Sequence, residues 1–92
     1  MSDIEIIDLE PEHFEVRVKE GSNTTTHHVR LAPDLLGDLG LGDMEPERIL
    51  RETFTFLLER ESASEIMDEF TLEDVARFFP EFYDEIRNRL GE

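Results

Sequence analysis

The adjacent histidines His27 and His28 are the first residues whose side chains could do chemistry, because imidazole is the commonest metal ligand in proteins. They lie in a threonine-rich, β-prone segment, and neighbouring residues of a strand point to opposite faces. Both rings therefore cannot chelate one ion, and His13 lies far along the predicted hairpin from His27. We expect no metal site, with His27 at the core edge near the turn and His28 on the solvent face.

Four acidic residues among three glycines could suggest a calcium loop between residues 34 and 45. Calcium loops of the EF-hand type need oxygen ligands at alternate positions around a central glycine, and this spacing does not fit. Helix capping and loop solvation explain the same acids, so we expect no calcium site. The acids are Asp34, Asp38, Asp43 and Glu45, and the glycines are Gly37, Gly40 and Gly42.

The sequence shows no catalytic pattern either. The lack of cysteine excludes a thiol nucleophile, a disulfide and cysteine-ligated zinc, and there is no GxSxG-like serine elbow. No glycine-rich phosphate loop stands between a predicted strand and a predicted helix. We therefore expect a protein that is not an enzyme, with no catalytic residue and no cofactor.

Aromatic residues are concentrated between residues 78 and 83, more densely than one helical face can bury. Helical spacing places residues 75, 79, 82 and 86 on one face, which leaves Phe78 and Tyr83 towards its flank. Aromatic side chains beyond the needs of the core often mark an interface, because they bury a large area at low entropy cost. The candidate protein-contact residues are Arg77, Phe78, Phe82 and Tyr83.

An antiparallel hairpin is predicted over residues 13–31. Residues 13–20 alternate between apolar and charged side chains, residues 24–31 are β-prone, and a Gly-Ser-Asn turn signal separates them. The apolar side chains share a face only if paired residue numbers add to an odd value. If the numbers of paired residues add to 45, the two strands are joined by a two-residue Ser22-Asn23 turn. This register pairs Phe14 with Leu31, Val16 with Val29, Val18 with His27, and Glu15 with Arg30.

The rest of the chain is predicted to be helical, apart from its N-terminus. Residues 1–10 are either an edge strand with a bulge or a loosely held arm. A short helix starts at Pro33, and a longer amphipathic helix covers residues 46–61. Ser62 or Ser64 caps a short helix with Ile66, Met67 and Phe70, and Thr71 starts the next. Pro80 separates that helix from a last one over residues 81–90.

These elements make one domain, because 92 residues are enough for one core and too few for two. Its β region covers about residues 3–31 and its helical region about residues 33–90. The predicted fold class is α+β: an N-terminal antiparallel β-hairpin or three-stranded meander, followed by three to four packed helices.

The formal net charge of −15 is spread over the chain, with 11 acids and 3 bases in residues 1–46 and 13 and 6 in residues 47–92. Such a surface repels nucleic-acid phosphates and anionic lipid and favours a basic partner. The N-terminus lacks a signal-peptide pattern, and no apolar run approaches the about 20 residues of a membrane span. We therefore expect a cytoplasmic protein with no membrane contact.

Residues 24–60 are similar to the core of the ribbon-helix-helix proteins, in which a polar-faced strand leads through a Pro-acid start into a leucine-bearing helix, a glycine loop and a second helix. The resemblance implies a dimer whose paired strands enter the DNA major groove, with Thr26, His28 and Arg30 as the outward, base-reading positions. The net charge of −15 opposes this, because DNA affinity depends largely on neutralising phosphates.

Most of the chain also resembles a group of short acidic bacterial proteins of unassigned function, chiefly in the segments HHVRL, FLLERE and TLEDVARFFPEFYDEIRNRL. This resemblance implies a self-contained domain and no activity. We predict a non-enzymatic protein-interaction or regulatory module whose protein partner is unknown and could be basic, or a second copy of the chain. The alternatives are a ribbon-helix-helix-like DNA-associated regulator or antitoxin, and an acidic decoy for a basic nucleic-acid-binding protein.

Overall fold

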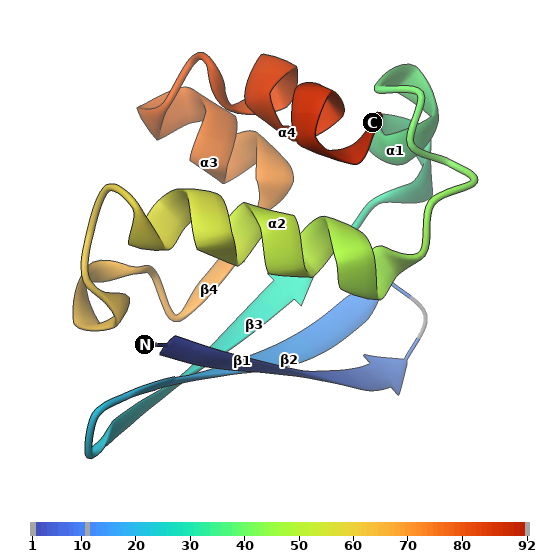
Figure 1. Cartoon of the computed structure of the whole chain (residues 1–92). Coiled ribbons are helices and arrows are strands. Elements are labelled where there is room, and N and C mark those ends of the chain that lie inside the picture. The colour runs from blue at the N-terminus through green and yellow to red at the C-terminus, as the bar shows by residue number, and fades with distance from the viewer. Residues whose placement is uncertain (1, 11, 92) are drawn as a thin grey trace.

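The computed structural model describes residues 2–10 and 12–91 and has an α+β fold, as predicted. A four-stranded sheet carries the helices on one side, and α2 lies across the sheet (Figure 1). The elements are β1 (Ser2–Glu10), β2 (His13–Glu20), β3 (Asn23–Arg30), α1 (Pro33–Asp38), α2 (Pro46–Leu58), the 3-10 helix η1 (Ala63–Glu65), β4 (Glu69–Thr71), α3 (Leu72–Phe78) and α4 (Phe82–Leu90).

The β2–β3 hairpin has the predicted faces but a different register. Phe14 lies opposite Val29, Val16 opposite His27, and Glu20 opposite Asn23, so the turn is Gly21-Ser22 and the predicted Ser22-Asn23 turn is wrong. Gly21 has a φ of 62°, which the first central residue of a type II′ turn requires and glycine adopts without strain. The register shifts by two residues, so every side chain keeps its face.

Residues 2–10 form a strand rather than an arm. β1 pairs antiparallel with β2, and its register shifts between Asp8 and Glu10, which agrees with the prediction of a bulge in this strand. β1 is therefore the outer strand of a three-stranded meander. The side chain of Arg51, from α2, donates a 2.9 Å hydrogen bond to the carbonyl oxygen of Ile4 in this edge strand.

The segment after α2 differs from its prediction. We expected a short helix with Ile66, Met67 and Phe70, but the helical part is the single 3-10 turn η1, and residues 69–71 form β4, parallel to β3. Phe70 lies opposite Val29 and is buried, and the backbone N–H of His28 donates to the carbonyl oxygen of Asp68. Pairing with β3 thus satisfies backbone groups that a short isolated helix would leave unpaired.

The core lies between the sheet and α2 and continues between α2 and α4. Phe54 contacts His27 and Phe70 on the sheet side, whereas Phe56 contacts Phe82 of α4. As predicted, Pro80 stands between α3 and α4. No helix in the described part of the chain is long and apolar enough to cross a membrane. The fully buried apolar side chains with the largest volumes are Phe54, Phe56, Phe82, Ile49, Leu50, Leu72 and Ile86.

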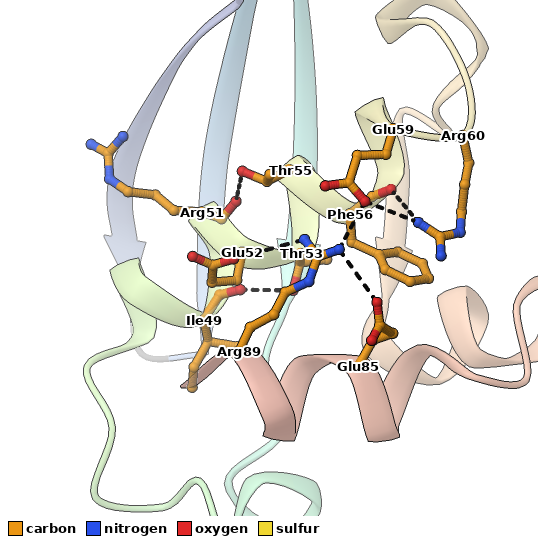
Figure 2. A network of polar contacts seen from close by, with 10 residues as sticks. All are labelled: Ile49, Arg51, Glu52, Thr53, Thr55, Phe56, Glu59, Arg60, Glu85 and Arg89. Carbon is orange, nitrogen blue, oxygen red and sulfur yellow. Dashed lines mark hydrogen bonds and ion pairs between the residues drawn. The ribbon is translucent and has the colours of Figure 1, made fainter. Parts of the chain in front are cut away.

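Figure 2 shows a network of polar contacts in and between α2 and α4. The Arg89 guanidinium lies 2.8 Å from a carboxylate oxygen of Glu59 and 3.4 Å from one of Glu85. The guanidinium of Arg60 lies 3.6 Å above the ring of Phe56 and also pairs with Glu59. Because Arg89 donates to Glu59, it holds the pKa of that carboxyl below its ordinary value. The Arg89–Glu59 pair holds α4 against the C-terminal end of α2.

Candidate functional site

An apolar pocket of about 190 Å³ lies between the end of α2, the loop before β4, and α3. Seven of its nine lining residues are apolar, and two are glutamates. Apolar pockets with a few polar groups are the usual binding sites of proteins. The lining residues are Leu57, Glu61, Glu65, Ile66, Met67, Phe70, Val75, Phe78 and Phe79.

The α3 wall of the pocket is set by a capping box at Thr71. The Thr71 hydroxyl oxygen accepts a hydrogen bond from the Asp74 backbone N–H, and the Asp74 carboxylate accepts one from the Thr71 N–H. This fixes where α3 begins and thereby brings Val75 and Phe78 to the pocket. The chain is no longer helical at Phe79, where φ is −129° and ψ is 89°, one residue before Pro80.

The opposite wall is tied to the sheet by His27. Its Nδ1 atom lies 2.8 Å from the carbonyl oxygen of Met67, and its Nε2 atom lies 2.9 Å from the hydroxyl of Thr25. We expected His27 at the core edge, but it is only 1% exposed, so it is a fully buried polar residue with both ring nitrogens hydrogen-bonded. Its neighbour His28 is exposed, as predicted.

Two large apolar side chains are exposed at this pocket. Phe78 is 65% exposed and Met67 is 37% exposed. Among the described residues only Leu9, in β1, is a further large apolar side chain with such exposure. Exposed apolar surface next to a pocket is typical of a binding site rather than of a solvated surface.

The four predicted protein-contact residues have different surroundings. Phe78 lines the pocket, and the side chain of Arg77, next to it, is 75% exposed and pairs with Asp74 at 3.5 Å. Phe82 is fully buried against Phe56, so it belongs to the core and not to a contact surface. Tyr83 is half-buried outside the pocket lining, and burial, with Glu73 as a second cause, raises the pKa of its hydroxyl.

The charge of the pocket rim is negative, a feature that the sequence-based search for a contact surface missed. Between Arg60 and Arg77 the sequence has six acids and no base, a signal that could have located the site. Burial raises the pKa of the Glu61 carboxyl, and the nearby Glu65 raises it further. The pKa of Glu65 is lowered, because the backbone N–H and the hydroxyl of Ser62 both donate to it.

The predicted nucleic-acid contacts Thr26, His28 and Arg30 are all exposed on β3. Each of the two basic side chains already lies near a carboxylate: His28 is 3.6 Å from Glu15, and Arg30 is 3.6 Å from Glu12. In a ribbon-helix-helix dimer the ribbon strand pairs with its copy along a free edge. Here β3 has β2 on one side and, at residues 28–30, β4 on the other.

Metal ligands do not gather in the described part of the chain: it has no group of three or more histidine, aspartate or glutamate side chains that could hold an ion. Comparisons of the chain with protein-family models, with curated proteins and with solved structures found no match.

Proposed function

We propose that this protein is a non-enzymatic interaction module that binds a protein partner through the pocket beside α3. One observation supports this most: of the three exposed large apolar side chains among the described residues, two lie on this pocket. Exposed apolar surface is stabilised when a partner removes it from water, at about 25 cal/mol per Å².

The size of the pocket favours one side chain of a partner over a metabolite. Its volume of about 190 Å³ is below the roughly 300–1,000 Å³ of most small-molecule sites. It is close to the ~150 Å³ cavity that accepts a benzene molecule. A leucine, methionine or phenylalanine side chain therefore fits, and anchors of this kind provide most of the binding energy of many interfaces.

A DNA-associated role has less support from the same structure. The only described strand with the predicted base-reading residues is β3, whose His28 and Arg30 lie beside Glu15 and Glu12. Phosphate binding would have to compete with these acids and with a net charge of −15. We therefore propose a protein, and not a nucleic acid, as the partner.

The test uses pools of short synthetic peptides that differ only in the central residue, which is leucine, methionine or phenylalanine in one set and alanine in the other. We expect the full chain to bind the first set more tightly. Phe78→Ala should weaken that binding about 10- to 30-fold, the range of an interface anchor. Leu9→Ala is the matched control, because it removes an exposed apolar side chain away from this pocket. Equal binding of both sets would contradict the proposal.

A further inference from the structure

The two glutamates that line the pocket have no cation to pair with in the part of the chain that the structure describes. Neither Glu61 nor Glu65 lies within 4.0 Å of an arginine, lysine or histidine nitrogen there. The arginines nearest in sequence are engaged elsewhere. Arg60 stacks on Phe56 and pairs with Glu59 and Glu81, and Arg77 pairs with Asp74. The negative charge of the two glutamates that line the pocket is therefore not compensated by these arginines.

This arrangement is unfavourable for the isolated protein. Glu61 is partly removed from water beside a second carboxylate, and both effects disfavour its charged form. Glu65 cannot turn away easily, because it accepts hydrogen bonds from Ser62 in the cap of η1. An unfavourable charge beside an exposed apolar pocket is characteristic of binding sites, where stability and function compete.

The chemistry of the occupant follows from what would stabilise these uncompensated carboxylates. A neutral apolar segment would fill the pocket but leave the two carboxylates unpaired. A second copy of the chain would bring a further charge of −15 towards the same acids. A segment with lysine or arginine next to its apolar anchor would pair with Glu61 and Glu65 while the anchor fills the pocket.

We propose that the partner segment is a cationic peptide, with one large apolar side chain flanked by lysine or arginine. This inference rests on the proposed function and adds the charge of the partner to it. Three more acids of the same base-free stretch, Asp68, Glu69 and Glu73, add to the negative charge of this part of the chain, whereas Asp74 is already paired with Arg77.

The experiment compares three pools of short synthetic peptides that all carry the central leucine, methionine or phenylalanine. Their flanking residues are basic in one pool, neutral in the second and acidic in the third. The full chain should bind the basic pool about tenfold more tightly than the neutral pool at low salt. High salt should reduce this difference, because it screens exposed charges.

Glu61→Gln separates a binding role from a structural one. The variant should lose about two- to fivefold in affinity for the basic pool, the range of one exposed ion pair, with no change for the neutral pool. Its melting temperature should rise, since the partly buried charge beside Glu65 is gone. Asp43→Asn is the matched control, because it changes the net charge equally from the connection that precedes α2, whereas the pocket lies at the other end of that helix.

The outcomes distinguish the two proposals. If the basic and neutral pools bind equally, or if Glu61→Gln raises stability without changing affinity, the cationic partner is wrong and the interaction module stands. If none of the pools binds better than the alanine-centred peptides, the interaction module itself is wrong.

Discussion

The Nδ1 atom of His27 lies 2.8 Å from the carbonyl oxygen of Met67, forty residues later in the chain, and joins β3 to the loop that forms one wall of the pocket. The carbonyl can only accept, so the imidazole donates this bond. A buried polar side chain thus determines the position of a wall that the exposed Met67 side chain also lines.

Replacing His27 should therefore destabilise the fold as well as the pocket. His27→Ala removes a buried ring that contacts Phe54 and leaves the Met67 carbonyl without this donor. We expect a loss of about 2–4 kcal/mol in the free energy of unfolding, measured with urea. His28→Ala, at the exposed neighbour, is the control and should change stability by no more than about 0.5 kcal/mol. Equal effects of the two substitutions would contradict this role for His27.

Truncation of two phenylalanines near Pro80 should affect stability to very different extents. Phe82→Ala removes a fully buried ring, so we expect a loss of about 3–5 kcal/mol in unfolding free energy. Phe78→Ala removes a ring that is 65% exposed, and its effect on stability should stay within about 0.5 kcal/mol. Denaturant unfolding of both variants tests this, and a large loss for Phe78→Ala would mean that its role is packing.

The Arg89–Glu59 pair should make stability depend on acid pH. Arg89 lowers the pKa of the Glu59 carboxyl below its ordinary value of 4.5, so the folded state holds the charged form more strongly than the unfolded state does. That stability is present above pH 4.5 and is lost as the pH falls through the lowered pKa. Arg89→Met should reduce this loss in urea unfolding curves between neutral and strongly acid pH. If stability depends on acid pH in the same way in Arg89→Met and in the natural chain, this role of Arg89 is contradicted.

Glu61 should show the opposite pH dependence. Its pKa is raised above 4.5, so its charged form weakens the folded state, and stability falls as the pH rises through the raised pKa. Glu61→Gln should therefore melt at a higher temperature than the natural chain at neutral pH. The two proteins should become equal below pH 4.5, where the natural carboxyl is protonated in both states. If the melting temperature of Glu61→Gln stays higher than that of the natural chain below pH 4.5, the charge of Glu61 is not the cause of the difference.

The strands and helices could be predicted largely because local patterns determine them. Alternation assigned the faces of β2 and β3, and Pro80 and Thr71 marked the helix boundaries. The register depended on whether Gly21 or Ser22 begins the turn, which parity cannot decide. β4 could not be predicted, because its three residues are strand only through their pairing with β3.

The site could be predicted only in part. Phe78 was identified from the excess of aromatic residues, but the same argument included Phe82, which is buried by a contact with Phe56 on another helix. Met67 could not be identified, since its exposure depends on the loop that His27 holds. Glu61 and Glu65 belong to a base-free stretch that is visible in the sequence, but its position beside an apolar pocket is a tertiary feature.

The hydrogen bond from Arg51 to Ile4 has a consequence for how the protein behaves at high concentration. A nine-residue edge strand is a template on which the strands of other molecules can grow into cross-β fibrils. Arg51 occupies one backbone acceptor of this strand, and the bulge between Asp8 and Glu10 interrupts its regular spacing. Acid would neutralise the carboxylates of the strand but not this guanidinium. Arg51 and the bulge therefore still hinder strand pairing at this edge when the carboxylates of the strand are neutralised.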